Sequence, residues 1–166
     1  YEFHINGKQV GDALLAPGWT DYKKRLQYQT YDITKYLKEG PNAIGAILGD
    51  GWYTGYVGWS SKRHLYGTYP LKFLMQLVID CKDGSSQTII SDSSWKGNQG
   101  PILYSDLQDG EFYDARLDLG AWDQAGYNDN LWRPVMVGQK AYQGFLIAQP
   151  DEPIRVMNIV KPTKIT

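Results

Sequence analysis

The fold class of this chain follows from residues 71–84, which read LKFLMQLVIDCKDG. Apolar side chains occupy alternate positions in this stretch, and mostly polar ones stand between them. A period of two predicts a strand with one buried face. The side chains expected to point inward are Leu71, Phe73, Met75, Leu77, Ile79 and Cys81. Asp83-Gly84 then predicts a hairpin turn, with residues 87–91 as the returning strand.

Short alternating stretches recur on both sides of this hairpin. They cover residues 1–5, 25–30, 43–48 and 143–148. Asn6-Gly7 predicts a turn after the first, and the second alternates Leu26, Tyr28 and Thr30 with polar side chains. Helical signals are few, apart from one turn that Thr34 would cap. The sequence therefore predicts an all-β sandwich with long decorated loops.

Length and charge limit the class of protein. A chain of 166 residues is long enough for one domain that buries roughly 70% of its unfolded surface. Its 17 basic and 18 acidic residues nearly cancel, which argues against a nucleic-acid partner. No apolar run approaches the length of a membrane span, so no membrane partner is expected. Cys81 is the single cysteine, which excludes an intrachain disulfide, and we expect it to be a small core residue.

The composition changes near the end of the chain. Residues 1–148 form the predicted β-sandwich domain, and residues 149–166 are richer in proline and predicted to be extended. We expect this exit segment to lead towards a following domain and to pair as an edge strand on the way. The chain opens at Tyr1 inside an alternating pattern, so we interpret it as a segment of a longer protein whose compartment the sequence does not indicate.

Aromatic residues alternate with glycines in residues 49–59, which read GDGWYTGYVGW. Glycine lets the backbone approach a ligand closely, and indole and phenol rings offer flat faces with polar edges. Such a segment is typical of a sugar-recognising surface. The alternative is that the rings close the end of the sandwich. The candidate carbohydrate-binding residues are Asp50, Trp52, Tyr53, Tyr56 and Trp59.

Residues 110–116, which read GEFYDAR, carry the best acidic group. In an extended strand Glu111 and Asp114 point to opposite faces, so they are poorly placed as a glycosidase acid pair. We therefore favour an ion pair between Asp114 and Arg116. Neither histidine stands in a metal-ligand spacing, and no nucleotide loop or nucleophile elbow is present, so no catalytic residue is assigned.

Several motifs, taken in order, resemble the N-terminal domain of bacterial α-L-rhamnosidases. They are Pro17-Gly18-Trp19-Thr20-Asp21-Tyr22, Tyr31-Asp32-Ile33-Thr34, Gly49-Asp50-Gly51-Trp52-Tyr53, Asp92-Ser93-Ser94-Trp95-Lys96, residues 110–116 and Trp132-Arg133-Pro134-Val135. The resemblance covers almost the whole chain. It implies a jelly-roll domain that accompanies a downstream (α/α)6-barrel, and that barrel would hydrolyse terminal α-L-rhamnosides with inversion.

The resemblance also implies roles for particular residues. It assigns Asp50, Trp52 and Tyr53 of the first motif, and Glu111, Tyr113 and Asp114 of the second, to contact with a rhamnose-containing glycan. Some related modules bind rhamnose with calcium, but calcium needs six or more oxygen ligands, and Asp50 and Asn98 are the only candidate donors we identify. No cofactor is therefore expected, and calcium is the alternative that stays open.

Three functions remain open at this stage. The chain is expected to be a non-catalytic accessory module that contacts a rhamnose-containing glycan. The first alternative is a structural module that braces the catalytic barrel of the same polypeptide without a ligand of its own. The second is a small stand-alone hydrolase, which the missing acid pair disfavours.

Overall fold

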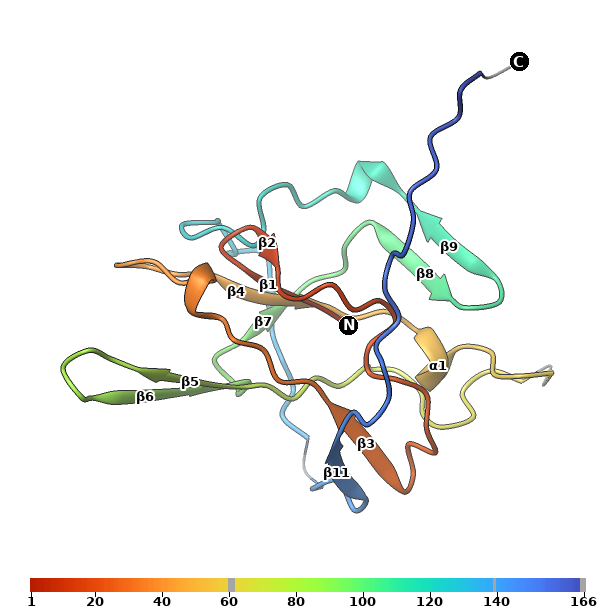
Figure 1. Ribbon diagram of the computed structural model, residues 1–166, viewed down its shortest axis with the longest axis horizontal. Coiled ribbons are helices and arrows are strands. Elements are labelled where there is room, and N and C mark those ends of the chain that lie inside the picture. The colour runs from red at the N-terminus through yellow and green to blue at the C-terminus, as the bar shows by residue number, and fades with distance from the viewer. Residues whose placement is uncertain (60–61, 139, 165–166) are drawn as a thin grey trace. The chain divides into compact units, whose positions relative to one another are not determined.

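The computed structural model describes residues 1–59, 62–138 and 140–164 (Figure 1). Short strands and loops make up nearly all of it, with three brief helical turns. The strands are β1 (Glu2–Ile5), β2 (Lys8–Gln9), β3 (Arg25–Tyr28), β4 (Ile44–Ile47), β5 (Gln76–Asp80), β6 (Ser86–Ile90), β7 (Lys96–Gly97), β8 (Ile102–Asp106), β9 (Gly110–Tyr113), β10 (Arg133–Pro134) and β11 (Phe145–Ala148). The helical turns are η1 (Thr34–Tyr36), α1 (Gly51–Thr54) and η2 (Ala115–Leu117).

The contacts within the chain group it into two compact units. Unit 1 consists of Tyr1–Ile47, Asp123–Ala125 and Gly144–Thr166, and unit 2 consists of Leu48–Trp122 and Gly126–Gln143. The first and last parts of the chain therefore belong to the same unit. The predicted domain boundary after residue 148 stays a prediction.

Unit 1 opens with the predicted hairpin. β1 pairs with β2 and, on its other edge, with β4, in both cases antiparallel. The turn residues Asn6 and Gly7 have φ values of 51° and 78°. Two consecutive positive φ values are what a tight two-residue hairpin turn requires, and asparagine followed by glycine suits them best. Asp123 joins this unit through its carboxylate, whose Oδ2 lies 2.8 Å from Nδ1 of His4.

The helical turn predicted at Thr34 is present as η1, but a different side chain starts it. Oδ1 of Asp32 accepts hydrogen bonds from the backbone N–H of Thr34 at 2.9 Å and from its hydroxyl at 2.7 Å. An aspartate that binds the N–H two residues later is a common turn device. Thr34 is therefore the donor rather than the cap.

β3 and β11 of unit 1 pair in parallel and lie side by side in Figure 1. The register runs from Arg25 opposite Phe145 to Tyr28 opposite Ala148. Both strands were expected from alternation, but the inward face of β3 differs from that pattern. Gln27 is buried and Tyr28 is 49% exposed, so the polar side chain points inward.

The hairpin that predicts the fold class lies in unit 2 as β5 and β6, paired antiparallel around Asp83-Gly84. Alternation is confirmed, because Leu77 is buried and Val78 next to it is exposed. The first strand is shorter than predicted and starts at Gln76, although the carbonyl of Met75 still accepts a hydrogen bond from the N–H of Ser91 at 3.1 Å. The core position expected for Cys81 is wrong: its side chain is exposed, since the hairpin turn begins there.

The second hairpin of unit 2 is β8 paired with β9, with an irregularity between Ile102 and Tyr104. It carries Ser105 and Asp106 on one strand and Glu111 opposite Ser105 on the other. The short strands β7 and β10 pair antiparallel elsewhere in this unit. Ser105 and Asp106 of this hairpin contact the aromatic segment 49–59.

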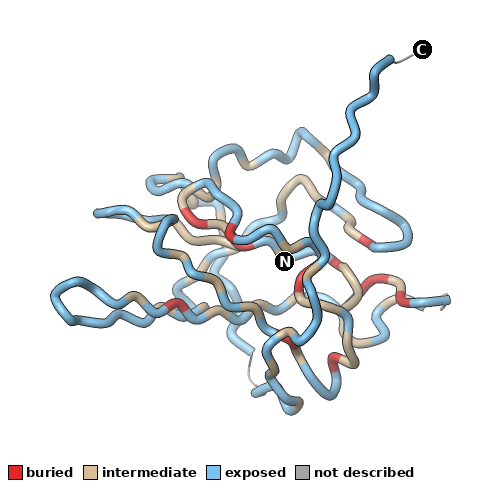
Figure 2. The backbone as a smooth tube through the Cα atoms, in the orientation of Figure 1, coloured by how far each residue is buried: buried red, intermediate tan, exposed pale blue. Residues whose placement is uncertain are grey.

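Buried positions are sparse along the tube in Figure 2. The buried apolar side chains of unit 1 include Phe3, Ile5, Val10, Ala16 and Tyr22, and those of unit 2 include Val57 and Leu77. The predominance of strands over helix confirms the all-β prediction. Among the described residues, no helix has the length and apolar composition that crossing a membrane requires.

Candidate functional site

The aromatic segment 49–59 is built around the short helix α1. Asp50 immediately precedes this helix, and its backbone carbonyl accepts a hydrogen bond from the N–H of Thr54 at 3.2 Å. The Asp50 side chain is 5% exposed. Its Oδ1 accepts a hydrogen bond from the hydroxyl of Tyr69, and its Oδ2 accepts one from the backbone N–H of Ser105 at 3.1 Å. Asp50 thus ties α1 to β8.

A guanidinium lies beside this carboxylate. Nη2 of Arg63 is 3.4 Å from Oδ2 of Asp50, and the guanidinium carbon lies 4.4 Å from the centre of the Tyr104 ring and 5.8 Å from that of Tyr56. Cations over aromatic faces are attracted by the ring quadrupole. Burial alone would lower the pKa of Arg63, but Tyr104 and Asp50 outweigh it and raise that pKa. The guanidinium therefore stays charged between its two ring faces.

Asp106 at the end of β8 is the second buried carboxylate of this region. Its Oδ2 accepts from the backbone N–H of Tyr56 at 2.7 Å, and its Oδ1 accepts from those of Gln108 and Asp109 at 2.8 and 3.1 Å. Burial would raise the pKa of Asp106, but these three N–H donors hold it below its ordinary value. Asp106 is thus an ionised anchor for the backbone of the aromatic segment.

The hydroxyls near these carboxylates are held as hydrogen-bond donors. The bond to Asp50 is the main reason why the pKa of Tyr69 is raised. The hydroxyl of Tyr104 donates to Oδ2 of Asp109 at 2.7 Å, which raises its pKa to about 12. The oxygens of Asp50 and Asp106 are engaged by protein donors, which hold the segment in place.

The four rings of the segment differ in exposure. Trp59 is fully exposed, while Trp52, Tyr53 and Tyr56 are half-buried. The hydroxyl of Tyr53 lies so close to Gly67 that a side chain at Gly67 would overlap it. Tyr53 thus packs against Gly67 and the Tyr56 ring faces Arg63, whereas Trp59 and the exposed part of Trp52 present ring surface to solvent.

The acidic motif 110–116 lies on β9 and the turn after it. Glu111 and Tyr113 are exposed on β9, and Glu111 stands opposite Ser105, the residue that donates to Asp50. Both predicted motifs thus meet on the β8–β9 hairpin. Asp114 starts η2, and its oxygens lie 2.8 Å from Nε and 2.6 Å from Nη2 of Arg116. The predicted ion pair between Asp114 and Arg116 is therefore present, and Arg116 lowers the pKa of Asp114.

The surroundings of Asp50 do not suit calcium. Its oxygens face a hydroxyl donor, a backbone N–H and a guanidinium, all of which compete with a cation. Asn98, the other predicted donor, is exposed and accepts from the N–H of Gln99 at 3.0 Å. Within the part of the chain that the structure describes, no three acidic, histidine or cysteine side chains gather as metal ligands.

Comparison with known protein families shows to which family the chain belongs. Residues 1–158 match the family described as the alpha-L-rhamnosidase N-terminal domain. The chain belongs to this family. This confirms the resemblance drawn from the motifs, and with it the sandwich class of the fold.

Curated relatives of this α-L-rhamnosidase N-terminal domain are all much longer than the chain. An alpha-L-rhamnosidase from Streptomyces avermitilis is 42% identical over 166 residues, which is all of this chain and 16% of the relative. One from an Alteromonas species is 33% identical over 168 residues, which is all of this chain and 18% of the relative. The chain thus spans about one sixth of the length of these relatives.

Solved structures give the same result. The crystal structure of the Streptomyces avermitilis alpha-L-rhamnosidase complexed with L-rhamnose has a TM-score of 0.85 at 41% identity, over 95% of this chain and 15% of that one. The native enzyme from Aspergillus terreus has a TM-score of 0.86 at 44% identity, over 93% of this chain and 18% of that one. The similar proteins therefore include a fungal enzyme besides the bacterial ones.

Sequence reasoning missed three residues that organise this region of the rhamnosidase domain. Asp106 carries a local signal, because an aspartate followed by residues 107–110 (LQDG) is typical of a turn that the carboxylate closes. Arg63 and Tyr69 have no such signal. Their partner Asp50 is identified from its motif, but what fills its hydrogen-bonding positions depends on how the loop after α1 folds back.

Proposed function

We propose that this chain is an accessory module of a larger α-L-rhamnosidase and contacts rhamnose-containing glycans through the aromatic segment 49–59. The observation that carries the proposal is the contrast between rings and carboxylates. Trp59 and part of Trp52 are open to solvent, while Asp50 and Asp106 are buried and engaged by protein donors. Exposed rings without a pair of available carboxyl groups favour binding over hydrolysis.

Rhamnose suits an exposed indole because its methyl group enlarges the apolar face of the sugar. Stacking of that face on a ring contributes about 0.5–1.5 kcal/mol beyond area burial if it resembles ring–ring contact. A monosaccharide in an open site makes few contacts to offset the translational and rotational entropy that it loses on binding. We therefore expect a dissociation constant near 1 mM, about 4 kcal/mol of binding free energy. Charged glycans have no basic cluster to meet in this segment.

Titration of the chain with L-rhamnose, followed by tryptophan fluorescence, tests this proposal. Trp59→Ala and Trp52→Ala should each weaken binding by about 1 kcal/mol, because each removes ring surface. Trp19→Ala, at another exposed tryptophan outside the segment, is the matched control and should leave the titration unchanged. Absence of saturation at concentrations about tenfold above the expected constant would exclude the sugar-contacting role.

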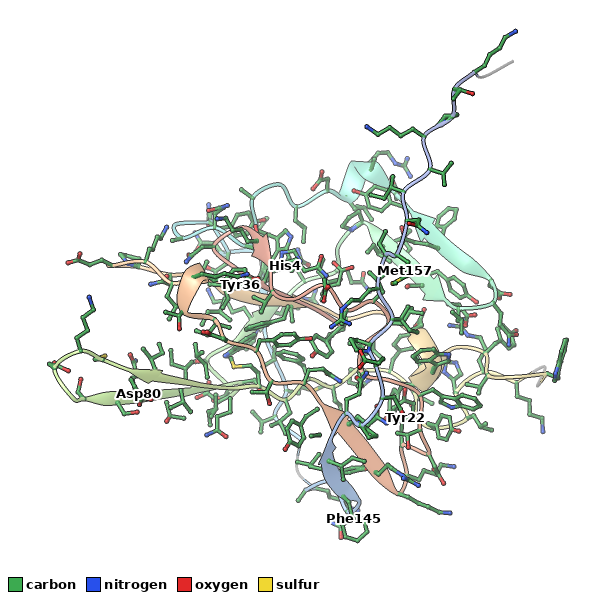
Figure 3. The ribbon with its side chains drawn as sticks, viewed as in Figure 1. His4, Tyr22, Tyr36, Asp80, Phe145 and Met157 are labelled. Atoms are coloured by element: carbon green, nitrogen blue, oxygen red, sulfur yellow. The ribbon has the colours of Figure 1, made fainter. Side chains whose placement is uncertain are left out.

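A second candidate function is a bracing module that packs against the downstream catalytic domain of the same polypeptide. The observation that favours it is the apolar exposure of the exit segment, which Figure 3 marks at Met157. Val156, Met157, Ile159 and Val160 are all largely exposed there. Apolar surface of this kind marks interaction sites. Two results together would favour the bracing role over sugar contact. Met157→Asp would lower the melting temperature of the full-length rhamnosidase, and the chain would not bind rhamnose.

A further inference from the structure

A groove in unit 1 lies beyond the carboxyl ends of the parallel strands β3 and β11. After Tyr28 and Ala148 the two chains continue as residues 29–31 and 149–155, and these continuations line a cavity of about 300 Å³. The groove is therefore formed by segments that are far apart in the sequence and are brought together by the parallel pairing. The volume lies at the lower end of the range for small-molecule sites, which suits one sugar ring.

Two glutamine amides form a fixed chain along this groove. Nε2 of Gln29 donates to Oε1 of Gln149 at 2.7 Å, and Nε2 of Gln149 donates to the carbonyl of Asp151 at 3.1 Å. Oε1 of Gln29 in turn accepts from the hydroxyl of Tyr1 at 2.7 Å. An amide has two N–H donors and two acceptor positions. Each amide therefore keeps one donor and one acceptor, which is the pattern that a pair of neighbouring sugar hydroxyls needs.

Aromatic and apolar surface completes the lining. Tyr28 is 49% exposed at the end of β3, and Tyr31 and Pro153 line the same cavity. The exit segment is held in place as a wall, because the N–H of Leu14 donates to the carbonyl of Ile154 at 2.8 Å. Polar hydroxyl partners beside a flat ring are the usual components of a saccharide site.

The charges of the groove select against an anionic ligand. Nε of Arg155 lies 2.9 Å from Oδ1 of Asp12, so the guanidinium is already neutralised at the rim. Nη1 of the same guanidinium lies 3.6 Å from Oε2 of Glu152, and Asp151 adds a further negative charge to the lining. A ligand with a carboxylate or phosphate would face more negative than positive charge here.

We propose that this groove binds a neutral pyranoside, with Gln29 and Gln149 as its hydroxyl partners and Tyr28 as its stacking ring. The site belongs to unit 1, whereas the aromatic segment 49–59 belongs to unit 2. The proposal therefore does not rest on the function proposed above for that segment. It gives the exit segment a second role as a wall of a ligand site.

Nuclear magnetic resonance titration of the isotope-labelled chain tests the groove. The probes are methyl α-L-rhamnoside, methyl α-D-mannoside and methyl β-D-galactoside, with galacturonate as the charged comparison. At least one neutral glycoside should shift the side-chain amide signals of Gln29 and Gln149 saturably, with a constant of about 1–10 mM. Galacturonate should shift them less. No saturable shift with any neutral glycoside, or tighter binding of galacturonate, overturns the proposal.

Substitutions test whether the Tyr28 ring stacks on the ligand, and they distinguish this effect from a loss of folding and from binding at the aromatic segment 49–59. Tyr28→Ala should weaken binding about three- to tenfold, and Tyr28→Phe should keep it because the ring remains. Tyr142→Ala, at a partly exposed tyrosine of unit 2, is the matched control. Trp59→Ala should leave the ligand-induced shifts of the Gln29 and Gln149 amide signals intact, even if it abolishes the shifts of residues 52–59. The two proposed sites are therefore tested independently. Equal binding by Tyr28→Ala and the unmodified chain overturns the assignment.

Discussion

Gly55 shows how a single residue fixes the aromatic segment. Its φ is −78°, which any residue adopts, so its backbone conformation does not require glycine. Space does, because a Cβ at this position would lie 2.3 Å from Oδ2 of Asp106 and 2.4 Å from the carbonyl oxygen of Gly51. The absent side chain lets Asp106 reach the backbone N–H of Tyr56, which holds the segment on β8.

Gly55→Ala should destabilise the chain by about 1–3 kcal/mol, because the methyl group displaces a buried carboxylate from its donors. Chemical denaturation in urea measures the change as a shift of the midpoint at constant slope. Gly138→Ala is the matched control, since a Cβ there meets nothing within 4 Å. A midpoint for Gly55→Ala equal to that of the control would show that Asp106 moves aside without cost.

Among the strands and turns, those defined by neighbouring residues were predictable and those defined by distant pairing were not. Asn6-Gly7 and Asp83-Gly84 each specify a turn by their own conformational preferences, and both hairpins are confirmed. The parallel pairing of β3 with β11 joins stretches about 120 residues apart, and no local preference encodes it. The alternation in β3 predicts that Gln27 faces outward, but Gln27 is buried in the strand that pairs with the distant β11.

The candidate site divides in the same way. Asp50 and the rings that follow it form a motif within a few residues, so the sequence identifies them. Asp114 and Arg116 are two residues apart, and their ion pair is confirmed. Asp106 acts on Tyr56 from 50 residues away, a distance over which a single sequence carries no pairing information.

Leu77→Ala should cost about 2–5 kcal/mol, because Leu77 is the buried side chain of β5. Leu74→Ala is the matched control, since Leu74 is 73% exposed and its truncation should stay within about 0.5 kcal/mol. Thermal or urea unfolding of both variants measures the difference. Equal losses would mean that the predicted alternation does not set the buried face of this hairpin.

At the level of the molecule, three carboxylates of the candidate site are engaged in holding the chain together. Asp50 accepts from Ser105 of β8, Asp106 of β8 accepts from Tyr56, and Asp114 is paired with Arg116. A glycosidase needs two carboxyl groups with different pKa values that flank the scissile bond. Glu111, exposed on β9, is left without such a partner in its motif.

The chain by itself should therefore not hydrolyse an aryl α-L-rhamnoside. Release of the aryl group, followed by absorbance over hours, measures this directly. Glu111→Gln and Asp114→Asn preparations serve as controls for contaminating enzyme, which would act equally in all three samples. Turnover that disappears in either variant would contradict the expectation and assign hydrolysis to this chain.

The parallel pairing of β3 with β11 also has a consequence for how the protein is made. During translation β3 leaves the ribosome long before its partner, because about 120 residues separate them. At about 5–20 residues per second, the nascent chain carries an unpaired β3 edge for roughly 6–24 s. Residues 48–122, which belong to unit 2, emerge during that interval. Unit 2 is therefore free to start folding first, while β3 waits for its partner strand until β11 arrives.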